Sequence, residues 1–225
     1  LGLLDLGIRS SIVRYVAKHK ANSDYQHLNQ VVNTGLVGYS LAGLAALVMG
    51  ISLGLASSTI FNIPAELETQ AAWVIILISI SMGLGFGTGA FASTLVGIEC
   101  FDLLNLAVSL GNLLRAGLVL LIFPFKADLL TLGLISSVSS LISFAMIIYF
   151  AFRREPNLRI NLKLANRRTA KIILNYGFFS FLIIIATRVS YYSDNTVIGI
   201  FGSAEEITYF AIGAICVEFL RRIVG

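Results

Sequence analysis

The chain has 225 residues, of which 57% are hydrophobic and only 12% charged, whereas a soluble globular domain has about 25% charged residues. This composition excludes a water-exposed surface without large apolar patches, and the apolar runs reach the ~20 residues that cross a bilayer. Such continuous runs also exclude the alternating strands of a β-barrel, so we expect an all-α, polytopic transmembrane helix bundle. The net charge of +4 is explained by orientation in a membrane, and no nucleic-acid partner is expected.

Seven apolar segments, separated by polar connections, predict seven helices. In chain order they cover about 1–18, 31–61, 71–97, 103–123, 129–152, 172–201 and 205–221. All three prolines fall between these segments, where a missing N–H interrupts no helical ladder. The first segment is short for a complete span and the last reaches the end of the chain. We therefore expect the chain to be a fragment of a longer protein.

Basic residues concentrate in alternate connections. Loops 19–30 and 153–171 are flanked by or contain most of the Lys and Arg residues, so the positive-inside rule predicts that both are cytoplasmic. We divide the chain into an N-terminal transmembrane lobe (1–152, incomplete at its start), a basic cytoplasmic linker (153–171) and the beginning of a C-terminal lobe (172–225). The linker is expected to be solvated, and the alternative is that it lies on anionic lipid headgroups.

Charged residues also lie inside the apolar segments, where an Arg costs about 2.5–3.5 kcal/mol unless it faces a partner or a hydrated cavity. Arg188 lies near the middle of segment 172–201, and Asp194 is about two turns further along. Six residues separate them by about 120° around a helix and ~9 Å along it, so they are not an ideal pair. Tyr191 and Tyr192 lie between them and are suited to supply hydroxyls or a face for sugar stacking.

Other intramembrane charges have local neighbours. Asp5 lies four residues before Arg9, and Glu218 lies four before Arg222, so an ion pair along one helix face competes with a functional role in both cases. Arg115 lies in the middle of the fourth segment. An interhelical ion pair and a role in substrate binding both remain open for it.

No catalytic, metal or nucleotide site is expected from the remaining motifs. The glycine-rich stretch 82–90 lies in a membrane helix and follows no strand, so Gly85 and Gly89 are interpreted as a surface for close helix contact. His19 and His27 lie in the first connection, and neither has neighbours of the metal-binding type. We therefore expect no metal, no cofactor and no enzyme activity.

Two stretches resemble oligosaccharide flippases, the polysaccharide-biosynthesis branch of the multidrug/oligosaccharidyl-lipid/polysaccharide (MOP) exporter superfamily. Residues 2–19, GLLDLGIRSSIVRYVAKH, resemble the second transmembrane helix of that family. Residues 173–214 resemble the seventh helix and the start of the eighth. There an Asp, an apolar run, Gly, Glu and Tyr follow in the family's order at Asp194, Gly202, Glu206 and Tyr209. The connection GIECFD departs from the family, whose members often carry a basic residue at this place.

The resemblance implies a fragment of a two-lobed exporter with six helices in each lobe, in the inner (plasma) membrane. It implies a flippase that moves polyprenyl-pyrophosphate-linked oligosaccharide from the inner to the outer leaflet by alternating access. Arginine forks bind phosphate well, so arginines lining a shared cavity would compensate the pyrophosphate. The expected substrate-binding residues are Arg9, Arg188, Tyr191, Tyr192, Arg115 and Asn175, and the expected ion-coupling or charge-tuning residues are Asp5, Asp194 and Glu218.

Three alternatives to a flippase remain. A cation-coupled multidrug exporter of the same superfamily would favour a cavity with uncompensated carboxylates. A glycan polymerase or ligase would be expected to have a large outward loop with catalytic Arg or His residues, whereas the outward connections here are short. A scaffold in a glycan-assembly complex is the third. The expected partners are the lipid-linked glycan, anionic lipids and, within an assembly complex, a glycan polymerase.

Overall fold

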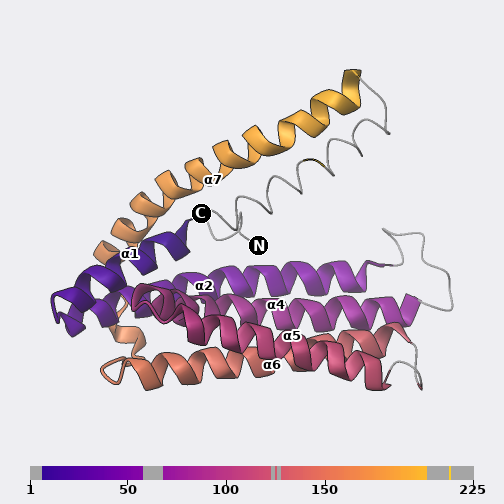
Figure 1. Ribbon diagram of the computed structural model, residues 1–225, viewed down its shortest axis with the longest axis horizontal. Coiled ribbons are helices and arrows are strands. Elements are labelled where there is room, and N and C mark those ends of the chain that lie inside the picture. The colour runs from indigo at the N-terminus through magenta and orange to yellow at the C-terminus, as the bar shows by residue number, and fades with distance from the viewer. Residues whose placement is uncertain (1–6, 58–67, 123–124, 126–127, 202–212, 214–225) are drawn as a thin grey trace. The chain divides into compact units, whose positions relative to one another are not determined.

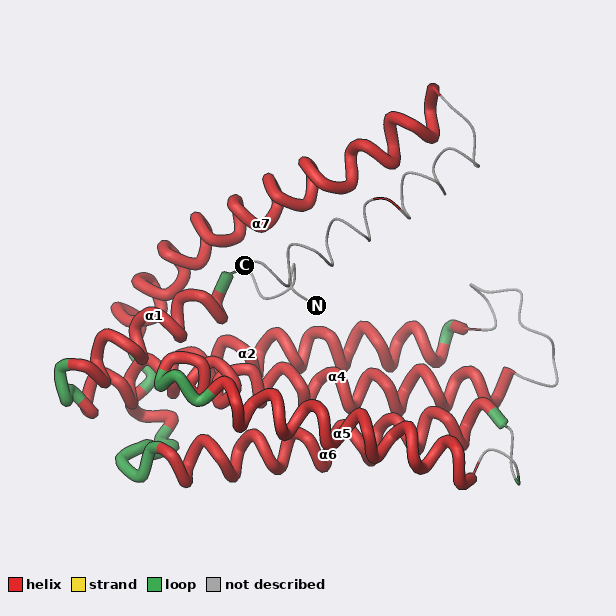
Figure 2. Tube along the Cα trace, viewed as in Figure 1, coloured by secondary structure: helices red, strands yellow, loops and turns green. Residues whose placement is uncertain are grey.

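The computed structural model describes residues 7–57, 68–122, 125, 128–201 and 213, and all regular structure within them is helical (Figures 1 and 2). The elements are α1 (Ile8–Ala21), α2 (Tyr25–Leu55), α4 (Glu68–Gly97), α5 (Phe101–Ile122), α6 (Leu129–Arg154), the 3-10 turn η1 (Leu162–Leu164) and α7 (Arg167–Phe201). They confirm six of the predicted helices, although α2 and α7 begin earlier than expected. The predicted helix 205–221 lies outside the described residues, Gly213 apart.

Five of these helical segments are long and apolar enough to cross a membrane. They are Tyr25–Leu55, Glu68–Gly97, Phe101–Ile122, Leu129–Arg154 and Arg167–Thr187. Large apolar side chains are exposed along them, such as Leu41, Leu44 and Met49 on α2. A bilayer accepts such a surface, and a helix satisfies its own backbone hydrogen bonds there. The chain is a multi-pass membrane protein.

The chain divides into two compact units, Leu1–Gly177 and Phe178–Gly225, here called unit 1 and unit 2. In unit 1, α4 is the central helix, because it packs against α1, α2, α5 and α6 (Figure 1). Helix α5 packs mainly on α6. The described part of unit 2 is essentially the remainder of α7. The lobe boundaries placed at 152 and 171 stay a prediction.

Glycines on α4 allow close contact with two different helices. A Cβ added at Gly85 would lie 2.9 Å from Phe144 Cζ on α6, and one added at Gly89 would lie 3.0 Å from the Tyr39 ring on α2. The structure thus agrees with the interpretation of these glycines as contact positions. However, the two residues serve different interfaces and do not form one common surface.

The main chains of α2 and α4 approach each other closely at Gly43 and Gly83. A Cβ at Gly43 would lie 2.5 Å from the Gly83 carbonyl oxygen, and one at Gly83 would lie 3.1 Å from the Gly43 oxygen. A backbone atom cannot move aside as the end of a flexible side chain can. Small residues at these two positions therefore set the distance between the two helices.

Gly43→Leu is expected to destabilise the protein by about 1–3 kcal/mol, because the added side chain must separate α2 from α4. The melting temperature of the intact protein in detergent measures the effect. Gly117→Leu on α5 is the matched control, since nothing lies within 4 Å of a Cβ at that position. Equal melting temperatures for both variants and the parent protein would contradict the close contact.

Candidate functional site

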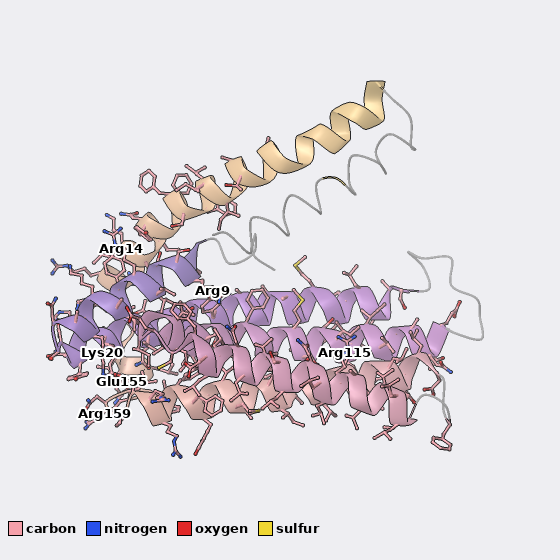
Figure 3. The ribbon with its side chains drawn as sticks, viewed as in Figure 1. Arg9, Arg14, Lys20, Arg115, Glu155 and Arg159 are labelled. Carbon is pink, nitrogen blue, oxygen red and sulfur yellow. The ribbon has the colours of Figure 1, made fainter. Side chains whose placement is uncertain are left out.

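The connection between α6 and α7 lies in contact with the ends of several helices of unit 1. Residues 155–166 contact the end of α1 and the start of α2, and the first turns of α7 contact α1. We call this region the linker end. Figure 3 labels Lys20, Glu155 and Arg159 within it. It contains most of the polar contacts between elements that the structure describes.

Two asparagines on successive turns of α2 form hydrogen bonds to the backbone of the connection, in the pattern that a neighbouring strand of a sheet would use. The Asn29 side chain donates to the Asn157 carbonyl (2.9 Å) and accepts from the Arg159 N–H (2.7 Å). The Asn33 side chain donates to the Arg159 carbonyl and accepts from the Asn161 N–H, both at 2.8 Å. Each side-chain amide therefore satisfies one carbonyl and one N–H of the connection.

The spacing of this asparagine ladder follows from simple geometry. Four residues of helix rise about 6 Å, and two residues of extended chain rise about 6.6 Å, so asparagines at i and i+4 match every second residue of the connection. Asn33 is fully buried and Asn29 is 7% exposed. The second amide hydrogen of each side chain is donated to a carbonyl of α2 itself. Asn29 donates to the Tyr25 carbonyl, and Asn33 donates to the Asn29 carbonyl.

The backbone of this connection is thus hydrogen-bonded to α2, and the choice between a solvated linker and one that lies on lipid headgroups stays a prediction. Leu158 is also buried, and the Asn166 N–H donates to the Thr34 hydroxyl at 3.2 Å. The basic side chains between 153 and 171 are exposed, which fits either alternative. These are Arg153, Arg154, Arg159, Lys163, Arg167, Arg168 and Lys171.

An ion pair joins α1 to the end of α6. Lys20 Nζ donates to Glu155 Oε2, and the Glu155 side chain is fully buried whereas that of Lys20 is 38% exposed. The hydrogen bond to Glu155 raises the pKa of Lys20 above its usual value, and burial acts in the opposite direction. Glu155 Oε1 is buried without a partner among the described atoms. Lys20 is thus the group that compensates this carboxylate.

The first turns of α7 are fixed against α1. The Ser11 hydroxyl donates to the Ile173 carbonyl at 2.7 Å. The Arg14 guanidinium lies 4.5 Å from the centre of the Tyr176 ring, and Tyr15 meets the same ring edge-on at 6.3 Å. A cation over an aromatic face contributes about 0.5–1 kcal/mol at an exposed site. The neighbouring Asn175, expected to bind substrate, is exposed, and its role stays a prediction.

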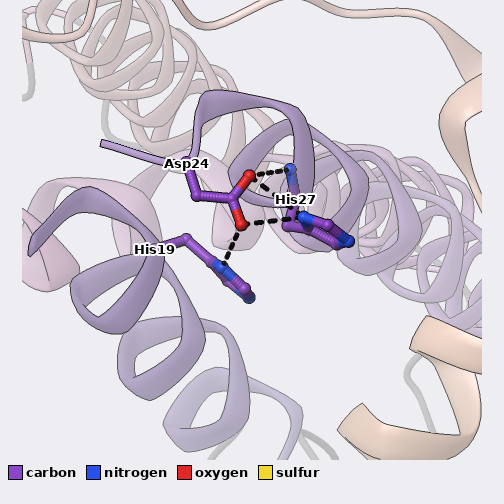
Figure 4. A group of neighbouring side chains, drawn as sticks. All are labelled: His19, Asp24 and His27. Atoms are coloured by element: carbon purple, nitrogen blue, oxygen red, sulfur yellow. Dashed lines mark hydrogen bonds and ion pairs between the residues drawn. The ribbon is translucent and has the colours of Figure 1, made fainter. Parts of the chain in front are cut away.

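A second polar cluster lies at the turn between α1 and α2. Asp24 is the N-cap of α2 and accepts from the His27 N–H at 3.2 Å. Its carboxylate also contacts His19 Nδ1 (3.2 Å) and His27 Nδ1 (2.8 Å), as Figure 4 shows. Hydrogen bonds from the His27 side chain, and then from its backbone, lower the pKa of Asp24. The expectation that the two histidines have no metal-binding neighbour is thereby corrected.

A cavity of about 390 Å³ adjoins this cluster. Side chains able to carry positive charge or to donate hydrogen bonds make up much of its lining: Lys18, His19, His27, Gln30, Asn166, Arg168 and Thr169. Tyr15 and the apolar side chains of Val31, Ile172 and Ile173 complete the wall. Of the expected substrate-binding residues, the described Arg9, Arg115 and Asn175 do not line this cavity.

The structure does not bring the described members of the expected substrate site together. Arg9, Arg115 and Asn175 are all exposed, on α1, α5 and α7 respectively. Helices α1 and α5 do not pack against each other in the described part of the chain. Among the described residues, none of the three side chains has a hydrogen bond or ion pair. Figure 3 labels Arg9 and Arg115.

The other expected site residues cannot be placed by their side chains. Four of them lie on the helical backbone of α7 with side chains outside the described part: Arg188, Tyr191, Tyr192 and Asp194. Asp5 and Glu218 lie outside the described residues altogether. Their roles stay predictions.

Comparison with known proteins identifies the fold. No family model and no curated protein matches the chain. Among solved structures, it is similar to a multidrug resistance transporter of the MATE family, in the MOP superfamily, captured in an inward-facing conformation. The TM-score is 0.64 and the sequence identity is 19%. The match covers 80% of this chain but only 42% of that transporter, so the chain spans less than half its length. The chain has the fold of a part of a MATE-like transporter.

Proposed function

We propose that the chain is part of a MOP-type exporter that moves its substrate across the membrane by alternating access, and that cation-coupled multidrug export is its first candidate activity. The observation that carries this proposal is the structural similarity over 80% of the chain to a multidrug transporter. The expected flippase activity finds less support there than its rival. The apolar helices of unit 1 supply the membrane-spanning scaffold that any such exporter needs.

A cation-coupled exporter needs a carboxylate at membrane depth to bind the coupling ion or a cationic drug. In the spans α2, α4, α5 and α6, the acidic residues lie only in the first turns, at Glu68 and Asp102. Asp194 lies within α7, about 10 Å along the helix from its end at Phe201 and about 15 Å from its midpoint at Ile184. Within the described helices, Asp194 is the acidic residue that lies beyond a first turn, and this proposal assigns coupling to it, whereas Asp5 and Glu218 lie outside the described residues.

Asp194→Asn is expected to abolish drug export, because the neutral amide cannot exchange the coupling cation. Cells that lack their own drug exporters would express the intact protein, and accumulation of a fluorescent cationic dye would be measured. The parent protein lowers accumulation, Asp194→Asn does not, and Asp102→Asn at the start of α5 retains export at matched expression. Equal accumulation with the parent protein and with no exporter would overturn the multidrug candidate.

Export of a lipid-linked, pyrophosphate-bearing glycan is the second candidate, because Arg115 is exposed in the middle of α5. An arginine at that depth costs about 2.5–3.5 kcal/mol against lipid, and a phosphorylated substrate in a hydrated cavity removes the cost. A leaflet-exposure assay for the lipid-linked glycan tests it. Exposure should require the protein and fall in Arg115→Gln, but not in the linker variant Arg159→Gln. Exposure that is independent of the protein would exclude this candidate.

A further inference from the structure

Three potential metal ligands converge at the turn between α1 and α2 (Figure 4). His19 comes from the last turn of α1, Asp24 is the N-cap of α2, and His27 comes from the first turn of α2. Their ligand atoms all lie within 4.8 Å of one another. The chain contains only these two histidines, so both of its imidazoles meet at one carboxylate.

The distances fit a small tetrahedral ion. Zn²⁺ binds imidazole nitrogen and carboxylate oxygen at about 2.0–2.2 Å, which places neighbouring ligand atoms about 3.3 Å apart. The Nδ1 atoms of His19 and His27 lie 3.2 and 2.8 Å from Asp24 Oδ2. The two rings are stacked at 5.4 Å between centroids and 16° between planes, and both direct Nδ1 towards the carboxylate (Figure 4). His27 is exposed and His19 and Asp24 are partly exposed, so small shifts of these side chains would admit an ion.

We propose that His19, Asp24 and His27 bind one divalent transition-metal ion, with Zn²⁺ the best match. Two imidazoles and one carboxylate suit Zn²⁺ better than Ca²⁺ or Mg²⁺, which prefer ligand sets made of oxygen. Three protein ligands leave a fourth position, and the adjoining cavity of about 390 Å³, which His19 and His27 line, has room for a water molecule or an anion there.

A bound ion would tie the last turn of α1 to the first turn of α2. The same stretch of α2 leads to Asn29, the first rung of the asparagine ladder, and the cavity also touches Arg168 and Thr169 at the start of α7. The ion would therefore act at the linker end, where α1 ends and α2 begins. The inference does not depend on which substrate the exporter moves. The competing arrangement is a carboxylate hydrogen-bonded to two imidazoles with no ion bound.

Zinc binding to the intact protein, purified without a polyhistidine tag and first stripped with a chelator, tests the proposal. Titration calorimetry and elemental analysis after dialysis should give one Zn²⁺ per chain. His19→Gln and His27→Gln should each weaken zinc binding at least about tenfold. Even loss of a residue that only supports a metal ligand typically weakens binding by that factor, and these residues are ligands themselves. Cys100→Ser, at the half-buried free thiol, should leave binding unchanged and is the matched control.

Asp24→Asn separates loss of the ligand from loss of the fold. Asparagine caps a helix as well as aspartate does, so α2 keeps its start while the charged ligand is removed. This variant should elute as the parent protein does in size exclusion but bind Zn²⁺ more weakly. With Co²⁺ in place of zinc, the parent protein should show the visible absorption of a tetrahedral site, and the double variant His19→Gln, His27→Gln should not. Absence of bound zinc in the parent protein, or equal binding by the double variant, would overturn the proposal.

Discussion

Lys20→Met is expected to destabilise the protein by about 3–5 kcal/mol, because it leaves the fully buried Glu155 carboxylate without its charge partner. Thermal unfolding of the intact protein in detergent measures the loss. Lys18→Met on the same helix is the control, since Lys18 is exposed and makes no ion pair among the described residues. A surface change of that kind stays within about 0.5 kcal/mol.

A double-mutant comparison identifies the origin of this loss. Glu155→Gln should cost less than Lys20→Met, because it removes the pair without leaving a buried charge. The double variant Lys20→Met, Glu155→Leu should recover much of the lost stability, since both charges are gone. A double variant that is no more stable than Lys20→Met alone would contradict a direct coupling between the two side chains.

The sign of the pKa shift predicts how this contribution varies with pH. The pKa of Lys20 is raised in the folded protein. The stability that the ion pair contributes is therefore fully present below the pKa of Lys20 in the unfolded chain, about 10.4, and is lost as pH rises through its pKa in the folded protein. The difference in stability between the parent protein and Lys20→Met should therefore stay constant from neutral to mildly alkaline pH.

The double variant Asn29→Ala, Asn33→Ala is expected to release the connection between α6 and α7. Each asparagine removed leaves a carbonyl and an N–H of the connection without partners, at about 1–3 kcal/mol for each site. Hydrogen exchange at the Arg159 and Asn161 amides is the most direct readout, because these N–H groups donate to the two side chains. Exchange there should accelerate strongly while exchange in α4 changes little.

Asn112→Ala on α5 provides the matched control for this release. Its side chain is exposed and makes no hydrogen bond among the described residues, so neither the melting temperature nor exchange in the connection should change. Unaltered exchange at Arg159 and Asn161 in the double variant would show that the ladder does not hold the connection.

The helices could be predicted because uninterrupted apolar runs of about 20 residues permit little else in a membrane. The start of α2 was missed for a physical reason. Its first turns, YQHLNQ, are polar and were assigned to a loop, yet they form a helix that buries Leu28 and Asn29 against other parts of unit 1. Contacts with other parts of unit 1, and not the hydrophobicity of the segment, therefore determine where α2 begins.

The contacts at the linker end could not be read from one sequence. Lys20 and Glu155 are 135 residues apart, and Asn29 reaches Asn157 across 128 residues. Nothing local marks such partners. The cluster of His19, Asp24 and His27 is different, because the turn between α1 and α2 is short and an Asp at the N-cap position precedes a His by three residues. That local signal was present in the sequence and was overlooked.

Charges in the apolar segments could be located from the sequence, but not their surroundings. Arg115 was expected in the middle of a span, and it lies in the middle of α5, exposed. The side on which a helix presents a residue depends on its neighbours, and α5 packs mainly on α6. The expected meeting of Arg9 with Arg188 stays a prediction, because the side chain of Arg188 lies outside the described part.

Transport by the purified, intact protein in lipid vesicles tests the proposed export most directly. Vesicles would carry an outwardly or inwardly directed gradient of H⁺ or Na⁺, with a cationic drug and a lipid-linked glycan offered in separate experiments. The account predicts that drug movement follows the direction of one cation gradient and is lost in Asp194→Asn. Movement of neither substrate above the level of protein-free vesicles, under any gradient, would contradict the assignment of this chain to an exporter.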